Sequence, residues 1–452
     1  MRFDFAGCCG CSFFSKKSVA DKVSPTIPFQ EASRKFSVGS FEQAAPVGRG
    51  IAGVHWQSSV QEQHLTAFSP FGAKPFDREW KFLCACASPS QGSAVEISAL
   101  TANLDWNLAL ELAEEHCVQG VVTERLKEAG HAGMPEAAWE KLQGKMRTQH
   151  LFTLSMTAEL FRILNAFAKA GIETILVKGP IVSFLAYGDP AVRGYVDLDL
   201  LVRDAAILPA SRILTELGFE ADVPEAAILA GKIPGEYLFK RAGAQQIVEL
   251  HTEHTFRYYP RPMRIEDLFT RRRRVPLDGR EVPALCLEDE LVLNCIHGAK
   301  HFWERLMWPA DIAAIVARHP EIAWERVRNA ARDVGAERMV HVGLLLAESL
   351  LGVPVPTEMA AKASTDGAAR DLVLQVESWL PTAGYKPPPL HRRAMFRLKM
   401  GGGGMRGTAY LVRLSVSPTE EDWSEGGEER GSRVWEAIKR PFRLIRKYGP
   451  DG

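Results

Sequence analysis

The stretch that decides the fold reads Tyr195-Val196-Asp197-Leu198-Asp199-Leu200-Leu201-Val202. Its apolar residues predict a buried strand, and side chains two residues apart on a strand point to the same face. The carboxylates of Asp197 and Asp199 therefore point the same way, and they repel each other unless a cation lies between them. A divalent ion with oxygen ligands, Mg2+ or Mn2+, is the simplest such cation. The alternative is a strand end at which both carboxylates face water and bind nothing.

The residues upstream predict a strand that leads directly into a helix. Residues 173–177 form the strand, and Lys178-Gly179-Pro180 is a turn whose proline suits the first position of a helix that runs to Tyr187. Free backbone N–H groups and the positive end of the helix dipole would attract an anion there, and Lys178 adds a point charge. Arg193 either reaches the same anion or closes a surface loop. Most Lys-Gly-Pro triplets are only turns, so this signal gains its value from the aspartates that follow.

A third acidic residue lies downstream in Ile247-Val248-Glu249-Leu250-His251. A carboxylate between Val248 and Leu250 needs a partner, because burying an unpaired charge is costly. A metal held by Asp197 and Asp199 would supply that partner. Three acids and a lysine suit phosphoryl chemistry, in which metal ions activate an attacking hydroxyl and stabilise departing pyrophosphate. The alternative is an edge strand whose Glu249 and His251 face solvent.

The pattern around these motifs predicts an α+β protein: a small mixed β-sheet core with helices, flanked by mainly helical regions on both sides. Within the core, a helix is expected over residues 209–217, and a hairpin is expected from residues 236–241 and 245–252. The expected divisions are a poorly ordered extension (1–78), an N-terminal helical region (79–150), the core (151–285), a helical domain (286–385) and a loop-rich tail with a basic amphipathic helix (386–452).

Composition narrows the class of protein. The chain has 452 residues, of which 46% are hydrophobic and 24% charged, and its formal net charge is zero. No global field therefore draws it to nucleic acid or to an acidic membrane. The eight cysteines show neither zinc-finger spacing nor a disulfide framework, which predicts a reducing, cytoplasmic location. The longest apolar stretch, residues 339–353, is too short to cross a bilayer, so no membrane span is expected.

Two further motifs each have a structural and a functional interpretation. Arg271-Arg272-Arg273-Arg274 is most often a solvated loop or face, and contact with phosphate or RNA is the alternative. His297 and His301 have the i, i+4 spacing that can bind zinc on one helix face. Gly298 follows the first histidine, where a zinc hydrolase has its glutamate base, so packing against Trp303, Trp308 and Asp311 is the favoured interpretation.

Several of these blocks, taken in order, resemble a known family, the bacterial uncharacterised nucleotidyltransferases of the polymerase-beta-like superfamily. The resemblance starts with Leu176-Val177-Lys178-Gly179, Tyr187, Arg193, the Asp-x-Asp strand and Glu249-Leu250-His251. It continues through Glu288-Asp289, His297, His301, Trp308 and Asp311, and it resumes at residues 418–422 and at Arg440-Pro441. In all it covers roughly residues 80 to 450.

The resemblance implies a nucleotidyltransferase fold that moves a nucleoside monophosphate from a nucleoside triphosphate to a hydroxyl. In it, Asp197, Asp199 and Glu249 are the catalytic residues and hold Mg2+ (or Mn2+), with His251 as an additional ligand. Phosphate binding is expected from Lys178, Gly179, Ser183 and Arg193. One departure stands out: superfamily members carry Gly-Ser at the helix start, whereas Pro180, which has no N–H, follows Gly179 here.

The sequence leaves the acceptor open among protein, RNA, a small molecule and a saccharide. A metal-dependent glycosyltransferase, in which Asp-x-Asp also holds a metal, is one alternative function. A non-catalytic nucleotide-binding or antitoxin-like partner protein with the same fold is another. A second acidic strand containing Glu249 favours nucleotidyl transfer over both.

Overall fold

The computed structural model describes residues 77–90, 94–131, 133–229, 236–241, 245–252, 260–261, 264–381, 388–416, 439–443 and 446. All of them belong to one compact unit. The predicted extension over residues 1–78 falls outside this set except for its last two residues. The amphipathic helix predicted in the tail also lies mostly outside the described residues.

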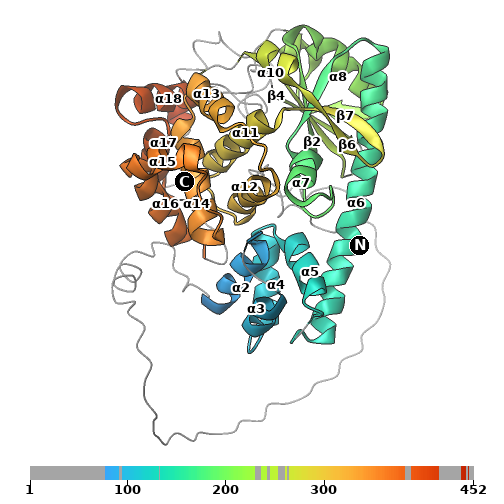
Figure 1. Ribbon diagram of the computed structural model, residues 1–452. Coiled ribbons are helices and arrows are strands. Elements are labelled where there is room, and N and C mark those ends of the chain that lie inside the picture. The colour runs from blue at the N-terminus through green and yellow to red at the C-terminus, as the bar shows by residue number, and fades with distance from the viewer. Residues whose placement is uncertain are drawn as a thin grey trace, which may run out of the picture. The chain divides into compact units, whose positions relative to one another are not determined.

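A seven-stranded sheet forms the core of the protein (Figure 1). Its order is β3-β4-β5-β2-β1-β7-β6, and the pairs β2–β5 and β1–β7 are parallel whereas the others are antiparallel. The mixed sheet confirms the predicted α+β class. The strands are β1 (Thr174–Val177), β2 (Asp197–Val202), β3 (Phe219–Ala221), β4 (Glu236–Arg241), β5 (Ile247–His251), β6 (Arg273–Leu277) and β7 (Arg280–Ala284).

Strand β2 lies near the middle of the sheet, between β5 and β1. Leu200 and Leu201, which point to opposite faces, are both fully buried, as expected for a strand covered on both faces. Helices α7 (Gly179–Tyr187) and α6 (Glu136–Lys169) both pack against β2. The short elements η1 (Asp204–Ala206), α8 (Ile207–Glu216) and α9 (Glu225–Leu229) complete this region.

Four short helices precede α6: α2 (Asp77–Ala87), α3 (Ala94–Leu100), α4 (Trp106–Glu115) and α5 (Gln119–Glu128). Helix α6 packs on α4 and α5, and elsewhere on β2 and α8 (Figure 1). Among the described residues, α6 alone is long and apolar enough to cross a membrane by length and composition, a test that core helices also pass. Five cysteines are described, and all are free thiols.

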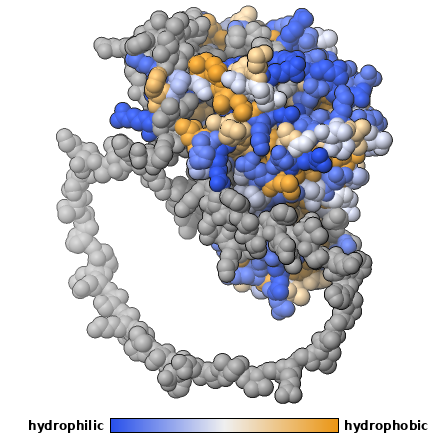
Figure 2. All heavy atoms as spheres, turned by 90° about the vertical axis from the view of Figure 1, so that its left-hand side faces the viewer, coloured by the Kyte–Doolittle hydropathy of each residue, from blue (hydrophilic) through white to orange (hydrophobic). Residues whose placement is uncertain are grey.

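The chain after the β6–β7 hairpin is helical, as predicted, and α10 (Ile265–Arg271) lies just before that hairpin. The helices after the hairpin are α11 (Leu287–Lys300), α12 (Met307–Arg318), α13 (Trp324–Val334), α14 (Glu337–Leu351), α15 (Thr357–Thr365), α16 (Gly367–Trp379), α17 (Leu390–Met400) and α18 (Gly404–Val416). The last two make this part of the tail more helical than the prediction of a loop-rich segment. Apolar side chains reach the surface of α16, α17 and α18, on the side that Figure 2 faces.

Two of the motifs noted in the sequence have defined places in the fold. Gly298 lies inside α11, where a Cβ atom would come within 2.5 Å of the Trp303 ring. The arginine run joins the end of α10 to the start of β6, and Arg272 and Arg274 in it are exposed, which agrees with the predicted solvated face. Within it, Arg271 pairs with Asp289 and Arg272 pairs with Glu173.

A close approach of α5 to the segment before β2 yields the first prediction. A Cβ atom at Gly120 would lie 1.9 Å from the backbone oxygen of Val192. Gly120→Ala should therefore lower the free energy of unfolding by about 3 kcal/mol, measured by urea denaturation. The matched control is Gly144→Ala in α6, where the nearest atom, of Arg147, is 4.0 Å away. It should raise stability by about 0.5–1 kcal/mol, and equal effects at both positions would contradict the close approach.

Candidate active site

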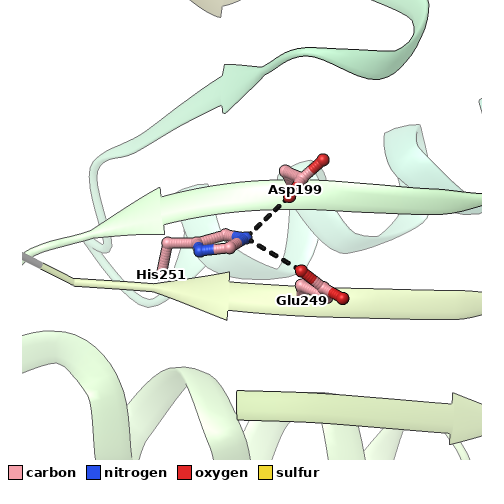
Figure 3. A group of neighbouring side chains, drawn as sticks. All are labelled: Asp199, Glu249 and His251. Carbon is pink, nitrogen blue, oxygen red and sulfur yellow. Dashed lines mark hydrogen bonds and ion pairs between the residues drawn. The ribbon is translucent and has the colours of Figure 1, made fainter. Parts of the chain in front are cut away.

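The strand register brings the acids of two distant segments together. β2 and β5 run parallel with Asp199 directly opposite Glu249. The side chains of both residues are almost fully buried, and both approach the imidazole of His251 (Figure 3). β5 lies between β4 and β2, so it is an interior strand and not the solvent-facing edge of the alternative interpretation. Glu249 therefore lies on the same side of the sheet as Asp199.

His251 bridges the two carboxylates. Its Nε2 lies 2.7 Å from Oδ1 of Asp199 and 3.4 Å from Oε2 of Glu249. Burial disfavours the imidazolium, but the hydrogen bonds to Asp199 and Glu249 outweigh it and raise the pKa of His251 to about 9. The imidazole is therefore a cation at neutral pH and offsets part of the negative charge.

Lys178 supplies the second cation from the turn between β1 and α7. Its Nζ donates to Oδ1 of Asp199 at 2.6 Å, and its side chain is 18% exposed. Burial opposes the ammonium form, but the charges of Asp199, Glu249 and Asp197 outweigh it and raise the pKa of Lys178. Conversely, burial would raise the pKa of Asp199, but Lys178 and His251 hold it below its ordinary value. Asp199 is thus ionised.

The backbone at Lys178 is unusual. Its φ of 53° is rare for a residue with a side chain, and such strain persists only where the surroundings impose it. Its N–H donates to Oε1 of Glu290 in α11 at 3.2 Å, and Asn294 donates to the same carboxylate oxygen at 3.4 Å. Glu290 therefore fastens α11 to the turn that aims Lys178 at Asp199. Glu290 was not among the predicted site residues, although an acid on the buried face of a helix is a usable signal.

Asp197 lies at the first position of β2, two residues before Asp199, and its side chain is half-buried. Burial and the nearby charges of Asp199 and Glu249 raise its pKa to about 7. Three of the described residues, Asp199, Glu249 and His251, have potential metal-ligand atoms that all lie within 4.8 Å of one another. The tight cluster thus includes His251 in place of Asp197.

The donor set fits a divalent cation. Two buried carboxylates on adjacent strands offer the oxygen ligands that Mg2+ and Mn2+ prefer. His251 could add a nitrogen ligand only after it releases its proton, because a protonated imidazole has no lone pair for a metal. Asp197 is placed on the same face of β2 to add a further oxygen ligand. The cluster could therefore hold a metal, with Lys178 beside it to attract phosphate.

Two predicted phosphate ligands serve the fold in this structure. The hydroxyl of Ser183 is fully buried, donates to the backbone oxygen of Asp189 at 2.6 Å and accepts from the N–H of Arg193 at 3.0 Å. The Nε of Arg193 donates to Asp311 at 2.6 Å, and both side chains are buried. Tyr187 donates to the other oxygen of Asp311 at 2.9 Å. These groups brace the segment that leads into β2, because they bond to one another instead of lining the acidic cluster.

The start of α7 offers few amides to an anion. Pro180 has no N–H, the N–H of Lys178 donates to Glu290, and that of Ile181 donates to the Lys178 carbonyl. Gly179, at a φ of 41°, is the remaining residue of this turn with an N–H. Phosphate binding here would depend on that N–H and on Lys178 Nζ.

The histidine pair of α11 packs on Trp308, as the favoured interpretation of that motif expected. The rings of His301 and Trp308 are stacked, with centroids 5.2 Å apart and planes 14° apart. His297 lies 4.7 Å from the His301 centroid. No third histidine, cysteine or acid of the described residues joins them within ligand distance, so the pair forms no metal cluster there.

The mixed sheet and its paired acids have the form of an α+β nucleotidyltransferase core. The chain belongs to the family described as uncharacterised nucleotidyltransferase, which it matches over residues 102–352, more than half of its length. The match confirms the resemblance noted from the sequence. No protein of curated function matches the chain.

His251 also gives a pH-dependent prediction for the protein in metal-free buffer. Its pKa is raised to about 9 against an ordinary value near 6.5, so its contribution to stability is complete below pH 6.5 and is lost as the pH rises through 9. The loss should be on the order of 3 kcal/mol. The raised pKa of Asp197 acts in a lower window, from about 4 to 7, in which stability also falls as pH rises.

Urea denaturation of the wild type and of His251→Gln between pH 8 and 9.5 separates the two groups, since this range lies above the pKa of about 7 of Asp197. The wild type should lose stability over this range because His251 releases its proton and gives up its charged hydrogen bonds to Asp199 and Glu249. The variant should show a much flatter profile. Parallel profiles would contradict the bridging imidazolium.

Proposed function

We propose that the protein is a Mg2+-dependent nucleotidyltransferase that moves a nucleoside monophosphate from a nucleoside triphosphate to a hydroxyl of an acceptor. One observation carries the proposal: Asp199 and Glu249 face each other on adjacent parallel strands, and Lys178 donates to Asp199 from the adjoining strand-to-helix turn. Membership of a nucleotidyltransferase family supports it.

Each residue then has a role that its position suggests. Asp199 and Glu249, with Asp197 beside them, would hold the metal, which when bound polarises the phosphates and the attacking hydroxyl. Lys178 binds the triphosphate by its ammonium group. Burial excludes water from Asp199 and Glu249, which strengthens these interactions.

The transfer itself exchanges one bond for another. The acceptor hydroxyl oxygen forms a bond to the α-phosphorus, and the bond from that phosphorus to the bridging oxygen of the β-phosphate breaks. Pyrophosphate leaves with the bonding electrons, and Lys178 offsets part of its charge. The hydroxyl proton passes to Asp197, whose side chain is more exposed than those of Asp199 and Glu249, and from there to water.

The test is transfer of label from each of four α-labelled nucleoside triphosphates, with Mg2+ or Mn2+, in a cell extract that supplies protein, RNA, saccharide and small-molecule acceptors. Labelled acceptor and stoichiometric pyrophosphate support the proposal. Nucleotide binding without turnover would favour the non-catalytic partner, and transfer from a labelled nucleotide sugar would favour the glycosyltransferase. Replacement of Mg2+ by EDTA should stop the reaction.

A further inference from the structure

A stripe of polar side chains runs along the buried side of α11. Glu290, Asn294, His297 and His301 follow one another at intervals of four, three and four residues, which places them on one helix face. Glu290 bonds to the backbone of Lys178, so this face is turned toward the proposed phosphate site. Apolar residues normally fill such a face, and a polar stripe there calls for partners.

Trp308 of α12 extends the stripe with a flat, apolar surface. Its ring stacks on His301, and its centroid lies 6.1 Å from that of His297. Helices α11 and α12 pack against each other, and α12 also packs against α7, which begins at the Lys178 turn. The three rings therefore lie where α11 and α12 meet, and α12 links this junction to the helix that begins at Lys178.

Two buried nitrogen atoms of these rings are available for hydrogen bonds. Nε2 of His301 and Nε1 of Trp308 are buried and have no hydrogen-bond partner among the described residues. Buried polar atoms are almost always satisfied, so such atoms indicate a bound water or a ligand. His297, His301 and Lys178 are each partly exposed, whereas Trp308 is buried beneath the imidazole of His301.

The charge state of the rings makes a neutral group a better partner for them than a phosphate. Burial, together with neighbouring cations that include Lys178, holds the pKa of both His297 and His301 well below its ordinary value. Both imidazoles are therefore neutral at pH 7. A neutral, planar surface with N–H donors and nitrogen acceptors at its edges suits a nucleobase, which stacks on aromatic rings and forms hydrogen bonds along its edge.

We propose that His297, His301 and Trp308 bind the nucleoside part of the triphosphate whose phosphates lie at Lys178. This inference rests on the proposed function and names the residues that hold the rest of that substrate. Along the axis of α11, His297 and His301 lie about 10 Å and 16 Å beyond Glu290, which bonds to Lys178. The phosphates and the nucleoside would thus occupy successive parts of one surface.

The test compares two ligands that share the phosphates but differ in the nucleoside. Isothermal titration calorimetry with Mg2+ measures the binding of each nucleoside triphosphate and of inorganic tripolyphosphate to the intact protein. His301→Phe and Trp308→Phe keep an aromatic ring but remove the unpaired nitrogen atoms. The control is His131→Phe, which alters a histidine stacked on Trp139 at 3.7 Å, outside the polar stripe.

The proposal expects His301→Phe and Trp308→Phe to weaken nucleoside triphosphate binding about tenfold each, the effect of one lost hydrogen bond. Tripolyphosphate binding should stay unchanged, as should both affinities in His131→Phe. If the wild type binds nucleotides better than tripolyphosphate and the variants do so equally well, this inference fails while the proposed function stands. If the wild type transfers label but the variants change only the acceptor's KM, the rings serve the acceptor and the inference also fails. If the wild type binds neither ligand, both proposals fail.

Discussion

Asp199→Asn should lower nucleotidyl transfer about a thousandfold, the upper range for loss of one well-placed electrostatic group. Asp199 contacts both cationic side chains of the site: Lys178 Nζ lies 2.6 Å and His251 Nε2 lies 2.7 Å from its Oδ1. The amide has nearly the same shape but no negative charge, so it would bind a divalent cation weakly. It would also leave Lys178 without the anion that aims it. The measurement is the rate of pyrophosphate release with labelled acceptor as the second readout.

The matched control is Asp222→Asn, which makes the same chemical change in a surface ion pair with Lys240. Exposed pairs of this kind contribute about 0–1 kcal/mol to stability, and Asp222 does not belong to the acidic cluster. Its rate should match the wild type. Thermal unfolding of both variants shows whether a loss of rate reflects a loss of fold. Comparable rates for Asp199→Asn and the wild type would remove Asp199 from the proposed chemistry.

Asp311→Ala should lower the free energy of unfolding by about 3–5 kcal/mol, because it removes one partner from a buried ion pair. The Nε of Arg193 lies 2.6 Å from Oδ2 of Asp311, with the two side chains 6% and 1% exposed. Tyr187 would lose its acceptor as well. The measurement is urea denaturation at pH 7.

Asp371→Ala is the control, since its carboxylate is 66% exposed and lies 3.9 Å from Lys399. It should change stability by less than about 0.5 kcal/mol. Replacing both buried partners, as Arg193→Met with Asp311→Leu, should restore part of the stability that Asp311→Ala removes. A loss in Asp311→Ala no larger than that in Asp371→Ala would contradict the buried pair.

Local periodicity was enough to predict the centre of the sheet. The strands that carry Asp199 and Glu249 place acidic residues within apolar runs, and both were expected where β2 and β5 lie. β6 and β7 were not predicted, because Pro276 and Pro283 and several charges argue against strands. They form a hairpin that pairs with the rest of the sheet only through β7. Such strands are defined by their neighbours more than by their own residues.

The residues of the candidate site were likewise predicted only in part from the sequence. Paired acids two residues apart can be found from the sequence, because strand geometry alone makes them share a face. The partners of Arg193 and of the Lys178 backbone could not be found, since Asp311 and Glu290 lie 118 and 112 residues away in the sequence. A buried group bonds to whatever the fold brings beside it. The spacing of residues within one segment does not show which distant residue that partner is.

The interior position of β2 and β5 has a consequence for how the acidic cluster can be lost. Each strand is bonded along both of its edges, so the amides at Asp199 and Glu249 cannot exchange with deuterium by fraying of a single ladder. Their exchange has to follow openings of the whole sheet. Mild denaturant would therefore dismantle the acidic cluster and the domain together, in one cooperative step.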